Sequence, residues 1–216
     1  GVLRVEDASE GAPLFGLSAV TAVSAIVWST LINPLGSESF IGDLIVVLYL
    51  LTIPPLALII GGFASRNPIS SLGASREMKL LFSYELPLIT AVIVPIIKTN
   101  SIKLGSIAAG QISHGAVAGS LSGFIALAVA VICVQAKMGQ PPFDIGEAEQ
   151  EIVAGPLMEY SGPALAVFKL TKWMMLFAAP GFLVLLFFPS AGFGMNLLKY
   201  AALLVVSILI KNTNPR

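Results

Sequence analysis

Carboxylate side chains gather in one short stretch of an otherwise very apolar sequence. Residues 141–162 lie between two long hydrophobic segments and contain five of the twelve acidic residues, namely Asp144, Glu147, Glu149, Glu151 and Glu159. Clustered acids can accept and release protons, because neighbouring negative charges favour protonation. We expect Glu149 and Glu151 in particular to carry protons. The alternatives are a docking surface for a basic partner and simple solvation.

The spacing of these acids predicts the start of a helix. Asp144 precedes Glu147 by three residues, which is the spacing of a capping box, and positions 147 and 151 would share one helix face. Glu147, Glu149 and Glu151 cannot all point the same way on a helix, so at most two of them can line a single path. For Asp144, a role as helix cap alone is the simpler interpretation.

Another acid, Glu85, lies in a hydrophobic segment that also contains Pro87 and Pro95. Each proline lacks an N–H group, which leaves a carbonyl in the preceding turn without its helical partner. Ionisable groups inside a bilayer are costly, and they commonly mark a path for protons or ions. We therefore predict a proton or water path at Glu85. The alternative is that its carboxylate reaches the interface and pairs with Arg76 or Lys79.

Glu77 stands eight residues before Glu85, which corresponds to about 12 Å along a helix and to nearly the same face. The two carboxylates could be successive stations of a proton relay bridged by water. Equally, Glu77 could alternate with Arg76 and Lys79 on a solvated face at the membrane interface.

Lysine residues within hydrophobic segments are candidate partners for these acids. Lys169 and Lys172 lie three residues apart, and on one helix face they could alternate with glutamates in a charged axis. Snorkelling of their amines to the interface is the alternative. Lys199 has no acid near it in the sequence, so it needs a partner from another helix or a position at the opposite interface.

Residue counts exclude metal centres and disulfide bonds. The sequence has one cysteine, Cys133, and one histidine, His114, which are too few for an iron–sulfur cluster, a structural zinc site or a disulfide framework. We expect His114 to be a hydrogen-bonded packing residue in a glycine-rich helix. No cofactor is therefore expected in this chain, and any redox chemistry belongs to a partner.

The composition places the chain in a membrane. Hydrophobic residues make up 56% of the sequence and charged residues only 11%, with a mean hydropathy of +0.90, whereas soluble domains contain about 25% charged residues. The formal net charge is zero, which gives no reason to expect nucleic acid as a partner.

Six segments are long and apolar enough to span a bilayer, which takes about 20 residues. They are residues 14–32, 43–64, 80–97, 106–134, 162–188 and 193–211. The predicted fold is therefore an all-α, polytopic membrane helix bundle, with residues 1–216 as a single transmembrane domain and with kinks at its internal prolines. The two longer connections, at about 65–79 and 135–161, contain most of the candidate acids.

Basic residues predict the orientation of the bundle. Seven Lys and Arg residues lie at the two ends of the chain and in the connections 65–79 and 135–161, whereas only Lys98 and Lys103 lie on the opposite side. Cytoplasmic loops carry an excess of Lys and Arg. We therefore expect both ends and both longer connections to lie in the cytoplasm.

Two long motifs resemble a known family of membrane subunits. Residues 141–162, PPFDIGEAEQEIVAGPLMEYSG, resemble the signature loop of the complex I membrane protein known as the H subunit or subunit 1, and of its counterparts in energy-converting membrane-bound hydrogenases. Residues 61–85, GGFASRNPISSLGASREMKLLFSYE, resemble an earlier loop of the same family and the helix after it. The order of spans matches over nearly the whole chain. Compared with that family, a first spanning helix, the segment after it and a last helix are missing, so we expect an incomplete chain.

The resemblance implies a non-catalytic membrane subunit of a respiratory-type complex in the cell membrane of a bacterium or archaeon. Its acidic loops would anchor a peripheral redox arm, whose subunits carry iron–sulfur clusters and, in hydrogenases, a nickel–iron centre. Antiporter-like membrane subunits would be further partners. Electron transfer would drive the translocation of protons or sodium ions through charged side chains, for which the candidates are Glu77, Glu85, Asp144, Glu147, Glu149, Glu151, Glu159, Lys169 and Lys172.

The segment GPLMEYSGPALAVFKL, residues 155–170, resembles the hydrogenase branch of the family more closely than the quinone-reducing branch. The main alternative is therefore a quinone-site subunit of NADH:quinone oxidoreductase. An ion-coupled secondary transporter also fits broken helices and buried carboxylates, although the sequence shows no inverted repeat. A passive membrane anchor would not need buried acids.

Overall fold

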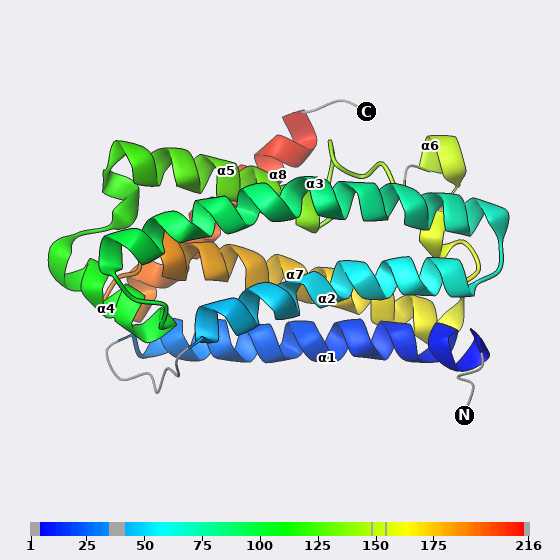
Figure 1. Cartoon of the computed structure of the whole chain (residues 1–216), viewed down its shortest axis with the longest axis horizontal. Coiled ribbons are helices and arrows are strands. Elements are labelled where there is room, and N and C mark those ends of the chain that lie inside the picture. Colours follow the sequence, from blue (N-terminus) through cyan, green and yellow to red (C-terminus); the bar gives the residue numbers. More distant parts are fainter. Residues whose placement is uncertain (1–4, 35–41, 148, 154, 214–216) are drawn as a thin grey trace.

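The computed structural model of the chain consists of helices that lie side by side (Figure 1). It describes residues 5–34, 42–147, 149–153 and 155–213, with only the backbone of residues 5–10 and 149–150. Within these residues there is no strand, so the predicted all-α fold is confirmed. The α-helices are α1 (Val5–Ile32), α2 (Asp43–Ala64), α3 (Pro68–Thr99), α4 (Leu104–His114), α5 (Leu121–Lys137), α6 (Glu149–Ile152), α7 (Gly162–Phe187) and α8 (Phe193–Thr213).

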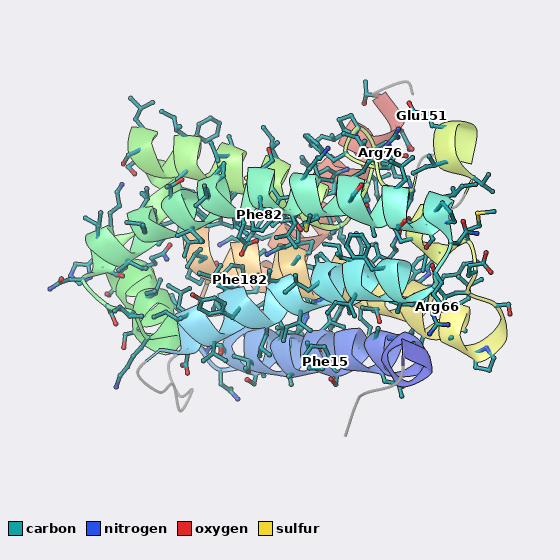
Figure 2. The ribbon with its side chains drawn as sticks, turned by 45° about the vertical axis from the view of Figure 1, so that its right-hand side comes forward. Phe15, Arg66, Arg76, Phe82, Glu151 and Phe182 are labelled. Atoms are coloured by element: carbon teal, nitrogen blue, oxygen red, sulfur yellow. The ribbon has the colours of Figure 1, made fainter. Side chains whose placement is uncertain are left out.

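The outer surface of the bundle suits a lipid environment. In the described part of the chain five helices are long and apolar enough to cross a membrane: α1 from Gly11 onward, α2, α3, α7 and α8. Phe15 of α1 is 54% exposed and Phe82 of α3 is 66% exposed (both labelled in Figure 2). Apolar side chains in such numbers on the outside are unfavourable in water and natural in lipid. The predicted membrane bundle is thereby confirmed.

Helix α7 forms the centre of the bundle. Every residue from Ala178 to Phe187 is buried, and the helix packs against α1, α5 and α8. The valines 20, 23 and 27 of α1 are completely buried, with the spacing of one helix face. Helix α3 packs against α2 and α5. The α2–α3 turn and α6 lie at one end of the bundle, and α4 lies at the other end (Figure 1).

The fourth predicted span, residues 106–134, is wrong as a continuous helix. A short 3₁₀ turn, η1 (Val117–Gly119), separates α4 from α5. Gly115, directly after α4, has a φ of 102°, which is a conformation that favours glycine. Ser120 then caps α5, because its side-chain oxygen accepts a hydrogen bond from the N–H of Gly123 at 3.2 Å.

A buried glutamine holds this break together. The amide nitrogen of Gln111 donates to the carbonyl of Leu186 in α7 at 2.8 Å, and its amide oxygen accepts from the N–H of Val117 at 3.1 Å. Backbone groups near the break thus find partners inside the protein, as buried backbone groups require. The sequence pattern had indicated only close helix packing for the glycines in this region.

Helix α3 begins at Pro68 instead of near residue 80, so most of the predicted connection 65–79 is helical. Asn67 caps the helix, since its side-chain oxygen accepts a hydrogen bond from the N–H of Ile69 at 2.9 Å. Proline at the first helical position costs no hydrogen bond. The cap at Asn67 therefore lets α3 start about twelve residues before its apolar part.

Glu77 and Glu85 consequently lie on one helix, as a relay along α3 requires. The helix runs through Pro87 and Pro95 without ending, and α7 likewise continues through Pro180. Prolines inside spanning helices are tolerated where neighbouring groups satisfy the freed carbonyls.

The predicted capping box is wrong. Residues 144–147 form a turn, in which the N–H of Glu147 donates to the backbone carbonyl of Asp144 at 3.1 Å, and α6 starts only after this turn. Gly146 lies against the side chain of Glu77, where a Cβ would collide. Contact with α3 therefore overrides the local helix signal, and Glu147 shares no helix face with the later acids.

Candidate functional site

The two sequence motifs lie against each other at one end of the bundle. A 3₁₀ turn of the second motif, η2 (Gly155–Leu157), packs on both α2 and α3 of the first. The hydroxyl oxygen of Ser70 lies 3.1 Å from the carbonyl oxygens of Gly62 and Pro156. A Cβ on Gly73 would stand only 2.7–2.9 Å from atoms of η2. Glycine is needed for such a close approach, so the loop is seated firmly on the α2–α3 turn.

Side-chain contacts also hold the loop against helices α2 and α3. The hydroxyl of Tyr160 donates to a carbonyl of α2 at 3.0 Å, and Asn67 donates to the carboxylate of Glu159. Glu151 forms an ion pair with Arg76 of α3 at the surface (Figure 2). With the Glu151 side chain 62% exposed, such a pair contributes about 0.2–1 kcal/mol. Glu151 and Glu159 therefore serve as surface contacts of the loop.

Next to this contact between the loop and the α2–α3 turn lies a cavity with a charged lining. Its volume is about 40 Å³, and a cavity needs only about 10–15 Å³ to hold one water molecule. Acidic and basic side chains from four different segments line it: Glu77 of α3, Glu147 of the loop, Lys137 of α5 and Lys172 of α7. The rest of the lining includes Pro54, Pro55, Leu58, Met138, Gly139, Phe168, Thr171 and Met175.

The cavity brings together three of the predicted site residues. Glu77 is buried, with 7% of its surface exposed, and the loop backbone at Gly146 covers its carboxylate. Glu147 forms an ion pair with Lys172, and a charged axis through Lys172 stays a prediction. Oxygen Oε1 of Glu147 is buried and has no hydrogen-bond donor among the described residues. Because an unsatisfied buried oxygen is unfavourable, water in the cavity is its natural partner.

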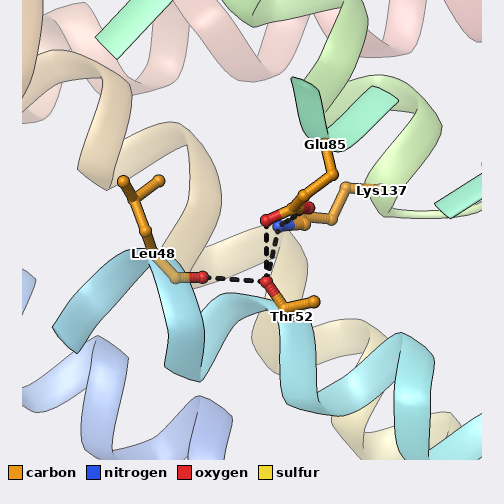
Figure 3. A network of polar contacts seen from close by, with 4 residues as sticks. All are labelled: Leu48, Thr52, Glu85 and Lys137. Carbon is orange, nitrogen blue, oxygen red and sulfur yellow. Dashed lines mark hydrogen bonds and ion pairs between the residues drawn. The ribbon is translucent and has the colours of Figure 1, made fainter. Parts of the chain in front are cut away.

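Glu85 belongs to a second cluster of polar side chains, together with Thr52 and Lys137 (Figure 3). Lys137 also lines the cavity. Its Oε2 lies 2.9 Å from the ammonium nitrogen of Lys137, and its Oε1 accepts a hydrogen bond from the hydroxyl of Thr52 at 2.9 Å. The Lys137 side chain is completely buried. Its nitrogen also lies 5.6 Å from the centre of the Tyr84 ring, a distance at which the ring face attracts a cation.

The alternative interpretation, in which Glu85 pairs with Arg76 or Lys79 at the interface, is therefore wrong. Its partner is Lys137, which the sequence interpretation treated only as a basic residue of a cytoplasmic connection. One signal was present. Gly123, Ala126, Ala130 and Cys133 follow one another at helical spacing and are all buried, and Lys137 continues that stripe. A lysine on the small-residue face of a helix points into the protein.

The remaining candidates are not among the residues that line the cavity. Asp144 is partly buried in its turn, and Lys169 is exposed on α7. Glu149 begins α6, but its side chain lies outside the described residues. Lys199 lies towards the opposite end of the bundle from α6, where its amine donates to the carbonyl of Phe188 at 2.7 Å and lies over the phenyl ring of that residue.

His114 is exposed instead of packed, and its Nδ1 lies 2.8 Å from the hydroxyl of Ser113 and 3.2 Å from the carbonyl of Gly110. Cys133 is buried in α5. Among the residues that the structure describes, no three His, Cys, Asp or Glu side chains are grouped as metal ligands.

Comparison with known proteins defines the family. The family model described as NADH dehydrogenase matches residues 5–216. The chain belongs to this family. Two curated relatives are H subunits of NADH-quinone oxidoreductase: the protein of Brevibacillus brevis is 33% identical over 172 residues, and that of Bacillus cytotoxicus is 33% identical over 179 residues. These matches cover 74% and 81% of the chain, and 50% and 53% of the relatives. The chain thus spans about half the length of the curated relatives it matches.

A solved structure resembles this NADH dehydrogenase family member over nearly the whole chain. The structure is that of the membrane-bound sulfane sulfur reductase, an archaeal respiratory membrane complex. The superposition has a TM-score of 0.88 at 27% sequence identity, and it covers 97% of this chain and 71% of the matched one. The family resemblance that the two motifs carried is confirmed by the family match.

Proposed function

We propose that this chain is the membrane subunit of a respiratory-type redox complex, in which it anchors a peripheral redox arm and couples electron transfer to the translocation of protons or sodium ions. Family membership, the names of the curated relatives and the likeness to a chain of a respiratory membrane complex support the first part. The observation that carries the second part is the gathering of Glu77, Glu147, Lys137 and Lys172 around one cavity.

This arrangement can link an event outside the membrane to charges inside it. Glu147 belongs to the loop that sits on the α2–α3 turn, whereas Glu77 and Lys172 belong to long helices. Charges interact more strongly in a protein interior than in water. A small displacement of the loop by a docked partner therefore changes the electrostatic environment of Glu77 and Lys172, which favours or disfavours a proton there.

The partners are proposed from the same family. The peripheral subunits would carry the iron–sulfur clusters, and antiporter-like subunits would complete the membrane part in the plasma membrane of a bacterium or archaeon. The motif GPLMEYSG, residues 155–162, favours a hydrogenase-like arm with a nickel–iron centre. A quinone-linked NADH dehydrogenase is the second candidate, and the names of the curated relatives favour it. Co-purified subunits and their metal content would decide between the two.

Neutral variants of the cavity acids test the coupling. Glu77→Gln and Glu147→Gln keep the size of the side chain and remove its titrating charge. In the complex purified with its own partner subunits, we expect each variant to assemble. The rate of ion translocation in proteoliposomes should fall by about tenfold or more, as when a positioned proton-transfer group is lost, and redox turnover should fall with it wherever the two are tightly coupled.

Lys199→Gln serves as the control, because Lys199 lies outside the cavity and glutamine can still donate to the carbonyl of Phe188. This control should translocate ions as the unmodified complex does. If both glutamate variants assemble and also translocate ions normally, the cavity has no part in coupling, and the chain is a passive anchor.

A further inference from the structure

Lys137 belongs to two clusters of polar side chains, the cavity lining and the cluster around Glu85, which share no other residue. On one side its ammonium nitrogen forms the ion pair with Glu85 at 2.9 Å. On the other side Lys137 lines the cavity that contains Glu77, Glu147 and Lys172, and Glu85 is not part of that lining. The Lys137 side chain has no exposure to the outside. Any exchange of charge between the cavity and Glu85 therefore has this amine as its shortest connection.

The hydroxyl of Thr52 is placed so that it can reorient when the protonation state of this amine changes (Figure 3). It has one hydrogen and two acceptors at almost equal distance, since Leu48 O lies at 3.0 Å and Glu85 Oε1 at 2.9 Å. Its oxygen can also accept from the Lys137 amine, which lies 3.4 Å away. A hydroxyl can rotate to suit the state of its neighbours. When Glu85 is ionised, Thr52 can donate to it, and when Glu85 is neutral, Thr52 can turn to the carbonyl of Leu48.

A proton transfer within this pair leaves the total charge unchanged. The N–H bond at Lys137 Nζ breaks and an O–H bond forms at Glu85 Oε2, so that ammonium and carboxylate become amine and carboxylic acid. In a buried site the ion pair has lost most of its hydration, which brings the neutral pair closer in free energy than it is in water. Lysine is suited to such a step, because burial makes its amine release a proton readily.

We propose that Lys137 carries protons between the cavity and Glu85. The amine takes a proton from the Glu77 and Glu147 side of the cavity and gives it to the carboxylate of Glu85, and Thr52 reorients with each transfer. This inference rests on the proposed coupling function and assigns a specific carrier to it. Without such a carrier, Lys137 would be only the fixed counter-charge of Glu85.

Arginine at this position separates the two roles. Lys137→Arg keeps a positive partner for Glu85, but a guanidinium group does not release its proton in proteins. In the complex with its native partner subunits, we expect the variant to assemble and the rate of ion translocation to fall by about tenfold or more. Lys199→Arg is the matched control, and it should translocate normally.

A second variant covers the case in which arginine does not fit. Lys137→Met with Glu85→Gln replaces the ion pair by a neutral pair of similar size, which is well tolerated in buried sites. If the Lys137–Glu85 pair were only a structural ion pair, this double variant would translocate ions normally. The carrier role requires that it does not.

The outcomes separate this inference from the proposed function. Normal translocation by Lys137→Arg, or by the double variant, overturns the carrier role. If Glu77→Gln and Glu147→Gln lose translocation while the Lys137 variants keep it, coupling stands and only the carrier is wrong. If all of these variants translocate normally, both proposals fail.

Discussion

Two ion pairs, each between a basic side chain and a glutamate, differ in what they can do. Arg76 and Glu151 meet at the surface, where water screens them and either partner can be replaced at little cost. Lys137 and Glu85 meet inside the bundle, where removal of one partner leaves a buried charge and costs about 3–5 kcal/mol. Burial, more than residue type, therefore decides which acids of this sequence belong to the functional site.

Gly146 is a residue at which one methyl group has a large effect. A Cβ there would collide with the carboxyl group of Glu77. We expect Gly146→Ala to lower the free energy of unfolding by about 1–3 kcal/mol, as overpacking of a filled site does. The midpoint of thermal unfolding of the purified protein in detergent is the measurement.

Gly110→Ala is the control for this change, because its Cβ would meet only the Thr99 side chain at 3.7 Å or more and alanine is a better helix former than glycine. Equal stability of the two variants would show that the loop can move away from Glu77 without cost.

Individual residues also mark how far the sequence could predict the site. Glu77 was a candidate because of its spacing from Glu85, Glu147 because it belongs to the acidic cluster, and Lys172 because it is a lysine in an apolar segment. The cavity brings the three together. The partner of Glu85 was missed, since pairing across helices depends on how helices face one another. Spacing along one helix cannot supply that information. Glu151 was expected in the relay, but its side chain is 62% exposed and pairs with Arg76 of α3, a contact that the spacing of the acids does not reveal.

At the scale of helices, apolar length predicted α2, α7 and α8 to within a few residues, because a bilayer fixes how long such a segment must be. The same criterion failed for residues 106–134. The small glycine and serine residues of this segment do not interrupt its hydrophobic pattern. The break in the helix depends instead on the hydrogen bond between Gln111 and the carbonyl of Leu186 in α7. Composition alone therefore does not distinguish one spanning helix from two shorter ones.

Gln111 is expected to determine whether this break is stable. Gln111→Met keeps the size of the side chain, but Leu186 O loses its donor from Gln111 and the N–H of Val117 loses its acceptor. Each buried group left without a partner costs about 1–3 kcal/mol, so the midpoint of thermal unfolding should fall clearly. Ser113→Ala removes only exposed contacts within α4 and should leave it unchanged. A stable Gln111→Met variant would mean that water satisfies the break.

For the whole molecule, the position of both motifs at one end of the bundle means that a partner bound to them would lie on one side of the membrane. Ile145, in the acidic loop, is 49% exposed, and Ile102, after α3, is 42% exposed. In a variant with Cys133→Ala, we expect Ile145→Cys to react with an impermeant thiol reagent in inside-out vesicles. Ile102→Cys should react in right-side-out vesicles. The reverse pattern would overturn the orientation that the basic residues predict.

The turn that carries Glu147 has a mechanical consequence for the whole assembly. Because Glu147 lies outside every helix, its carboxylate can leave Lys172 without the breaking of any hydrogen bond of a spanning helix. The long helices can therefore stay in place while the loop moves, so a rearrangement of the charged cavity needs no motion of a spanning helix. Under the proposed function, a partner bound to the exposed surface around Glu151 would displace this loop first. Energy supplied by such a partner would then be stored in a few backbone torsions of the loop before any helix moves.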